Sequence, residues 1–222
     1  MIKAVLFDLD GVVVDSEPLY QVAERRLFAR YGITIPDEDW ALFRGVSEDE
    51  FCQLARDRYK LPLPLEQLRA EGRKEVLEVF SGGLKFMEGF ETLYGQLRPD
   101  YQLGLVTSTP ETIFNMMDGR LQLRNLFPLV LIGEMTAHNK PHPEPYLTMM
   151  ATMRINPEET VVIEDSIYGL RSAWQSGAWT IALTGSIPVE AMPRRHLTVS
   201  HLSQLDAESI FSLPGRIAVA AG

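Results

Sequence analysis

A chain of 222 residues, 45% of them hydrophobic, is long enough to bury a substantial core. We therefore expect one domain with a smaller insert, or two modest domains. The 30 acidic and 21 basic residues give a net charge of -9 at pH 7, which argues against nucleic acid or an anionic membrane as a partner. An anionic substrate would have to be bound by positive charge gathered locally.

The sequence predicts a cytoplasmic protein. Cys52 is the single cysteine, so no disulfide can form within the chain, and a reducing compartment is favoured. Residues 1–3 lead directly into an apolar strand without a signal-peptide pattern, and no apolar run approaches the length needed to cross a membrane. We expect a monomer or a weak homodimer that binds neither membrane nor nucleic acid.

The first apolar run, residues 4–7, ends abruptly in two aspartates, Asp8 and Asp10, followed by Gly11. This pattern is typical of a buried parallel strand whose carboxyl end opens into a site. Residues two apart in an extended chain project to the same face, so both carboxylates point towards one place. A calcium loop needs glycine at its sixth position and glutamate at its twelfth, whereas here they stand fourth and tenth, which excludes that alternative.

Residues 15–85 are expected to be entirely helical. An early proline and an apolar stripe predict a first helix that ends at Gly32, and a short helix is expected near Pro36. Residues 47–50 form a capping-box pattern that begins the next helix. A last amphipathic helix ends at the glycine pair 82–83.

After this helical stretch the pattern alternates between helix and strand, which predicts an α/β fold with a parallel, doubly wound sheet. Strands are expected at 102–106, 129–132, 161–163 and 180–183, with helices near 89–97, 110–117, 143–153 and 167–175. Functional residues in such sheets gather at the carboxyl ends of the strands.

Polar residues occupy those positions. Thr107 and Ser108 follow the second strand, and Glu164 and Asp165 follow the strand at 161–163. A helix start with hydroxyl groups can bind an anion, although for such residues taken alone an ordinary N-cap is the more common explanation. Between these two places a loop carries Lys140, which taken alone would be a solvated surface lysine.

Convergence of these residues would require a cation. Each pair of carboxylates near 4 Å would repel by about 4 kcal/mol at an intermediate dielectric. Hard carboxylate oxygens with few other donors select Mg²⁺, which commonly bridges to a substrate phosphate. Lys140 and Thr107 would then be phosphate ligands. This set describes phosphoryl transfer, in which one carboxylate attacks phosphorus and another acts as general acid and base.

Four short motifs occur in order along nearly the whole chain: Asp8-Leu9-Asp10-Gly11-Val12, Thr107, Lys140-Pro141 and Glu164-Asp165-Ser166-x-x-Gly169. Together they resemble the four motifs of the haloacid dehalogenase superfamily of phosphohydrolases. The resemblance implies a Rossmann-like catalytic core, residues 1–14 and 86–222, and an α-helical cap domain, residues 15–85. Superfamily members with such a cap include phosphatases and sugar-phosphate mutases.

The resemblance also implies a role for each motif residue. Asp8 would form an aspartyl-phosphate, and Asp10 would protonate the leaving group and then activate water. Mg²⁺ would be held by Asp8, the backbone carbonyl of Asp10 and Asp165, with Glu164 beside it. The transferring phosphoryl group would be bound by Thr107 and Lys140, with the backbone amides of Leu9, Asp10 and Ser108 nearby. The second aspartate of the first motif argues against dehalogenation, because the dehalogenases lack it.

A phosphatase acting on a small phosphomonoester, such as a sugar phosphate, is favoured over a mutase. Residues 43–49 resemble the substrate loop of the cap in beta-phosphoglucomutase, but two positions differ. Glu48 stands where that mutase has an arginine for the second phosphate, and it would repel a bisphosphate. Tyr20 stands where the mutase has a histidine that helps the proton-transferring aspartate, and a phenol with a pKa near 10 cannot replace it.

Two alternatives stay open at this point. Arg44 is either a substrate contact from the cap or one partner in a surface salt bridge. The fold could also serve as a non-catalytic binding module, although such a module would have no need to keep the motif residues, which are all intact.

Overall fold

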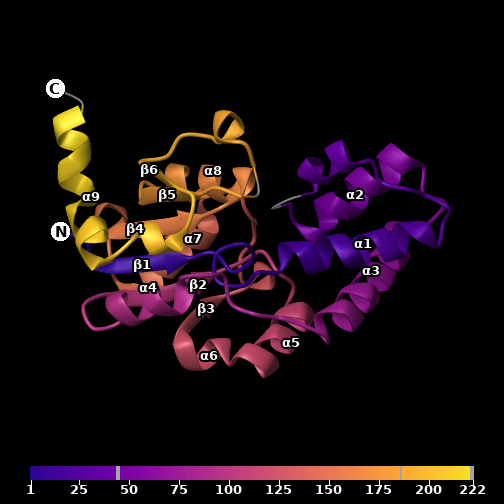
Figure 1. Cartoon of the computed structure of the whole chain (residues 1–222), viewed down its shortest axis with the longest axis horizontal. Helices are drawn as coiled ribbons and strands as arrows, with labels where there is room; N and C mark the ends of the chain where they lie inside the picture. Colours follow the sequence, from indigo (N-terminus) through magenta and orange to yellow (C-terminus); the bar gives the residue numbers. More distant parts are fainter. Residues whose placement is uncertain (44–45, 186, 221–222) are drawn as a thin grey trace.

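The computed structural model describes residues 1–43, 46–185 and 187–220. Its described strands form one parallel sheet in the order β3-β2-β1-β4-β5-β6, so the predicted α/β doubly wound class is confirmed (Figure 1). The strands are β1 (Ala4–Phe7), β2 (Gln102–Val106), β3 (Leu129–Leu131), β4 (Thr160–Glu164), β5 (Trp179–Leu183) and β6 (Leu197–Val199).

The register brings three strand ends together. Phe7, the last residue of β1, lies opposite Leu105 of β2 on one side and Ile163 of β4 on the other. Because the three strands run parallel, their carboxyl ends open at the same edge of the sheet. The residues that follow them therefore start from neighbouring positions.

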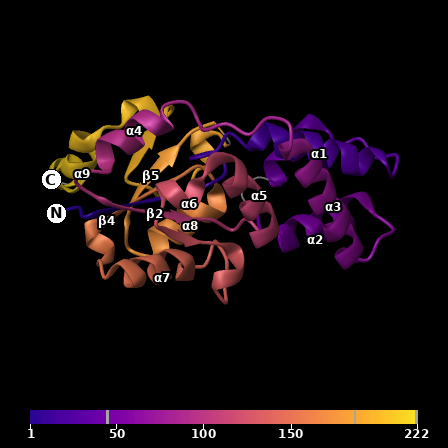
Figure 2. The same ribbon diagram turned by 90° about the horizontal axis from the view of Figure 1, so that it is seen from below.

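Helices cover both faces of the sheet (Figure 2). The first face packs against α4 (Phe90–Leu97), α5 (Glu111–Leu121) and α9 (Ala207–Ala220), and the second against α7 (Glu144–Met153) and α8 (Ile167–Gln175). Alternate side chains of β1 serve the two faces, since Val5 and Phe7 belong to one hydrophobic cluster and Ala4 and Leu6 to the other. This two-sided burial explains why the strand is apolar throughout.

Short elements complete this part of the chain. They are α6 (Leu123–Leu126), η2 (Gly133–Met135), η3 (Pro157–Glu159), η4 (Val189–Ala191) and η5 (Leu202–Gln204). The sequence analysis predicted neither β6 nor α9, and β6, a three-residue edge strand, is too short to show a hydrophobic period. Across the described ranges, no helix combines the length and apolar character needed to cross a membrane.

Residues 15–85, which we call the helical insert, contain α1 (Glu17–Ala29), η1 (Asp37–Leu42), α2 (Glu48–Tyr59) and α3 (Leu65–Phe80). It lies beside the sheet and has its own hydrophobic cluster, which includes Phe28, Trp40 and Leu68 (Figure 1). The two chain segments that join it to the sheet run side by side, with the amide of Asp15 donating to the carbonyl of Lys85 at 3.0 Å.

Two local predictions in the helical insert can be compared with the structure directly. The capping box is present, because the Ser47 hydroxyl accepts from the amide of Glu50 and the Glu50 carboxylate accepts from the amide of Ser47. The short helix expected near Pro36 is a 3-10 helix, η1, with bonds between residues three apart such as Asp39 N to Pro36 O at 3.0 Å.

Candidate active site

Lys140 joins residues from three strand ends. Its Nζ atom lies 2.5 Å from Oδ1 of Asp8, 2.7 Å from Oε1 of Glu164 and 3.0 Å from the carbonyl oxygen of Val106. The lysine side chain is 4% exposed and that of Glu164 is fully buried. One buried ammonium group thus pairs with two carboxylates and donates its third hydrogen bond to a backbone carbonyl.

Glu164 has further partners that hold it in place. The buried hydroxyl of Tyr146, from α7, donates to its Oε1 atom at 2.6 Å. Its Oε2 atom accepts from the amide of Asp165 at 3.2 Å and the hydroxyl of Ser166 at 3.3 Å. A Cβ atom at Gly169 would lie 1.9 Å from this carboxylate, so the glycine of the fourth motif is needed for the close approach of helix α8.

A group of three buried carboxylates could hold a divalent cation. Oxygen atoms of Asp8, Glu164 and Asp165 all lie within 4.8 Å of one another. Gly11, whose φ is +75°, makes room for this arrangement, because a Cβ atom there would lie 2.1 Å from Oδ2 of Asp165. Hard oxygen donors of this kind suit Mg²⁺. We call Asp8, Lys140, Glu164 and Asp165 the core cluster.

The charges of the core cluster perturb its titration. Burial, followed by the nearby charge of Glu164, raises the pKa of Asp8 to about 8. Burial alone would lower the pKa of Lys140, but Asp8 and Glu164 raise it above its usual value. A divalent cation beside Asp8 would favour its carboxylate form and oppose the effect of burial. The site is therefore more acidic than its one lysine can balance.

Asp10 has different surroundings from Asp8. It is partly exposed and accepts hydrogen bonds from the Ser16 hydroxyl at 2.5 Å and from the Thr109 hydroxyl. Burial raises the pKa of Asp10, and the two hydroxyl groups oppose that rise. The Thr107 hydroxyl, which the sequence assigned to phosphate, donates to Thr109 at 2.9 Å. Thr109 was not singled out from the sequence, although its place two residues after Thr107 was an available signal.

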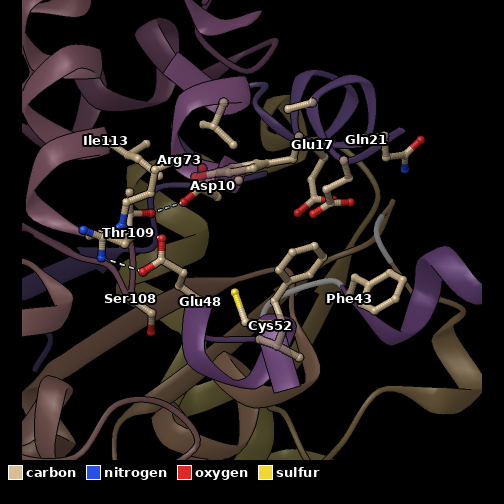
Figure 3. Close-up of a pocket in the computed structure, with 18 of the residues that line it drawn as sticks. Asp10, Glu17, Gln21, Phe43, Glu48, Cys52, Arg73, Ser108, Thr109 and Ile113 are labelled. Atoms are coloured by element: carbon tan, nitrogen blue, oxygen red, sulfur yellow. Dashed lines mark hydrogen bonds and ion pairs between the residues drawn. The ribbon is translucent and has the colours of Figure 1, made fainter. Parts of the chain in front are cut away.

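A cavity of about 150 Å³ lies between these strand ends and the helical insert. Asp8, Asp10 and Lys140 line it from the side of the sheet, and residues of α1, α2 and α3 line it from the helical insert. Figure 3 shows Asp10 together with Glu17 of α1, Cys52 of α2 and Arg73 of α3 around this space. Ser108 and Thr109 also line it, so the loop after β2 faces the same space. This arrangement suits an anionic group bound against the sheet and a tail bound by the helices.

The sequence model of the haloacid dehalogenase-like hydrolases matches residues 5–183. The chain belongs to this family. The matched range includes β1, the helical insert and the sheet as far as β5, and it therefore contains all four motifs and the cavity. The resemblance seen in the sequence is confirmed.

Named relatives and solved structures of this hydrolase family agree with that assignment. A phosphorylated carbohydrates phosphatase of Thermotoga maritima is 34% identical over 176 residues, 79% of this chain and 82% of the relative. A 6-phosphogluconate phosphatase of Escherichia coli is 27% identical over 207 residues, covering 92% and 93%. The crystal structure of a beta-phosphoglucomutase from Clostridium difficile has a TM-score of 0.83 at 22% identity, covering 99% and 100%, which shows the shared fold.

The remaining residues predicted from the sequence of this hydrolase lie in the core, at the cavity or outside the described residues. The Leu9 side chain is fully buried in the core, so only its backbone can serve a substrate. Arg44 lies outside the described residues. Tyr20 lines the cavity and packs edge-on against Phe80, with ring centroids 4.8 Å apart. Glu48 also lines the cavity but is not an isolated carboxylate, because Arg73 binds both of its oxygen atoms.

Proposed function

We propose that this hydrolase is a Mg²⁺-dependent phosphatase that cleaves small phosphomonoesters, such as sugar phosphates, through an aspartyl-phosphate on Asp8. The observation that carries the proposal is the contrast between the two aspartates that border one cavity. Asp8 is fixed by Lys140 within the core cluster, whereas Asp10 is held apart by two hydroxyl groups. Two carboxylates in such different environments suit a nucleophile and a proton carrier.

The named relatives support this class of substrate. They include phosphatases named for phosphorylated carbohydrates, 6-phosphogluconate, fructose 1-phosphate and hexitols. These compounds share a phosphate ester on a short polyhydroxy chain or ring. A cavity with an acidic, lysine-containing floor and a mixed apolar and charged wall suits a ligand of that kind.

In the proposed reaction Asp8 attacks phosphorus, and the bond between phosphorus and the ester oxygen breaks. Asp10, protonated at that moment, gives its proton to the departing alkoxide, so the alcohol leaves neutral. Asp10 then takes a proton from the water that attacks the aspartyl-phosphate, which releases phosphate and restores Asp8. Lys140 orients the Asp8 carboxylate and offsets the charge of the phosphoryl oxygens.

Asp8, Asp165 and the backbone carbonyl of Asp10 would hold the Mg²⁺, with Glu164 beside it. Glu164 is the least available of the three clustered carboxylates, because Lys140 and Tyr146 already bind its Oε1 atom. When bound, Mg²⁺ would neutralise phosphoryl oxygens and the repulsion between the carboxylates.

The helical insert would act as a cap domain over this site, with residues 15–85 as the cap and residues 1–14 and 86–222 as the catalytic core. It contributes the wall of the cavity opposite Asp8 and Asp10, so a substrate bound there would be enclosed. Enclosure excludes bulk water and limits access to small phosphate esters.

Phosphorus NMR tests the proposal. The purified protein is incubated with Mg²⁺ and a panel of sugar phosphates that includes beta-glucose 1-phosphate with trace bisphosphate. Release of inorganic phosphate supports the phosphatase, whereas growth of glucose 6-phosphate without free phosphate would identify a mutase. Asp8→Asn is expected to lower kcat/KM by on the order of 10⁴-fold. Turnover that survives this change would overturn the assignment of Asp8, and absence of turnover in the wild type would favour a binding module.

A further inference from the structure

Ion pairs between α2 and α3 lie on the wall of the cavity opposite the core cluster. Glu48, the first residue of α2, binds Arg73 of α3 through both carboxylate oxygens, at 2.6 Å to Nε and 2.5 Å to Nη2. Arg69, one turn earlier on α3, lies 3.7 Å from Glu48 and 2.5 Å from Asp49. We call these four residues the arginine cluster. Figure 3 shows Glu48 and Arg73 facing each other at the cavity.

Charge along the cavity is predominantly negative. Among the described residues that line it, six are acidic and three are basic. Each of the three basic residues already has a carboxylate partner, because Lys140 binds Asp8, Arg73 binds Glu48 and Arg69 binds Asp49. A second phosphate on a substrate would therefore meet carboxylates without finding uncompensated positive charge among these lining residues.

The Glu48 carboxylate occupies the donors of Arg73 that a distal anion would need. Two parallel N–H bonds to one carboxylate use the Nε–Nη2 edge of the guanidinium group, an edge that could otherwise bind a phosphate in the same way. A distal phosphate on that edge would have to displace the carboxylate and leave Glu48 without its partner, and a phosphate elsewhere on Arg73 would lie close to the Glu48 charge. Hydroxyl groups can donate to a carboxylate and accept from a guanidinium, so they leave the pair intact.

We propose that Glu48 is a specificity residue, which makes the cap end of the cavity accept an uncharged, hydroxyl-bearing tail and reject a second phosphate. The inference rests on the proposed phosphatase function and adds to it the substrate class, a sugar or polyol monophosphate. Two aromatic residues that line the same cavity, Phe43 and Phe51, supply an apolar surface for the carbon skeleton of such a tail.

The test compares two substrates with one carbon skeleton. Phosphorus NMR follows release of the 1-phosphate from fructose 1-phosphate and fructose 1,6-bisphosphate, and from the corresponding glucose pair, by the wild type and by Glu48→Gln. We expect the wild type to prefer the monophosphates in kcat/KM by at least tenfold, and Glu48→Gln to reduce that preference at least tenfold. Adding Arg73→Gln to Glu48→Gln should remove the gain, because the freed guanidinium would be its source.

A matched control separates this effect from a change in net charge. Glu66→Gln removes the same charge from an exposed position on α3 that does not line the cavity, and it should keep the preference of the wild type. A preference that is unchanged in Glu48→Gln, or a wild type that prefers the bisphosphates, would overturn the role of Glu48. No release from any compound, including p-nitrophenyl phosphate, would instead overturn the phosphatase function itself.

Discussion

The core cluster and the arginine cluster face the same cavity but are built differently. In the core cluster the side chains of Lys140 and Glu164 are 4% and 0% exposed, whereas those of Arg73 and Glu48 in the arginine cluster are 34% and 19% exposed. A buried charge that loses its partner is strongly destabilising, while a half-exposed one can turn to water. Substitutions in the core cluster should therefore destabilise the fold strongly, and substitutions in the arginine cluster should do so much less.

This difference separates the residues proposed to carry out the reaction from those proposed to select the substrate. The carboxylates of the core cluster lie at strand ends whose register is set by the central sheet, so their geometry is fixed by the largest hydrophobic cluster of the described chain. The arginine cluster lies on two helices of the helical insert, where substitutions at surface positions change the free energy of unfolding little. One family can thus keep a single reaction and change the substrate.

Substitution of Lys140 should lower both the stability of the fold and the rate of phosphate release. Lys140→Met leaves Asp8 and Glu164 buried without their counter-charge, so we expect a loss of about 3 kcal/mol in the free energy of unfolding. Loss of the cation that faces the phosphoryl group should lower kcat by at least about 100-fold. Urea unfolding without Mg²⁺ measures the first effect and phosphate release the second. Lys74→Met, at an exposed position on α3, is the control and should change neither.

Gly11→Ala should lower activity by roughly 100-fold, because the added Cβ atom displaces the Asp165 carboxylate from the core cluster. The control is Gly32→Ala. Gly32 has a similar backbone, with φ of +68° against +75°, but no atom lies within 4 Å of its added Cβ. Both variants carry a similar backbone strain, but only Gly11→Ala adds the clash with Asp165, so Gly11→Ala should lose more stability than Gly32→Ala. Equal activity in the two variants would mean that the close approach of Asp165 has no catalytic role.

Tyr146→Phe should cost less, about 2 kcal/mol of stability, since a hydrogen bond to a buried charged acceptor is lost while Lys140 still binds Glu164. Activity should fall by about tenfold as the carboxylate becomes less restrained. Tyr94→Phe removes a hydroxyl bond to the Leu126 carbonyl, away from the cavity, and should leave kcat unchanged. A similar fall in kcat for the two variants would contradict a positioning role for Tyr146.

The sequence predicted the sheet and the residues at its strand ends because both depend on local patterns. An apolar run followed by acids marks a buried strand and its carboxyl end, and parallel pairing then brings Asp8 and Asp165 to one edge. The sequence places Gly11 and Gly169 in motifs. Only the structure shows that a Cβ atom at these positions would clash with the carboxylates of Asp165 and Glu164, respectively.

Residues whose role depends on the packing of separate elements could not be predicted. Tyr146 is one aromatic residue among the apolar residues of α7, and only the fold shows its hydroxyl at Glu164. Arg73 lies 25 positions from Glu48 in a different helix, with no spacing rule to link them. The sequence therefore identified Glu48 as a repelling charge but not the arginine that it occupies.

Of these variants, Glu48→Gln should change the free energy of unfolding least, and it tests whether the arginine cluster is needed for the fold. Because the pair with Arg73 is partly exposed, the variant should lose about 1 kcal/mol or less in the free energy of unfolding, measured in urea beside Glu66→Gln. Glutamine keeps the side-chain shape and one acceptor, and the guanidinium can turn to solvent. A loss as large as that of Lys140→Met would make the arginine cluster a structural element of the helical insert. A small loss of stability together with an altered substrate preference would mean that substitutions in the arginine cluster can change the substrate without disturbing the fold or the reaction.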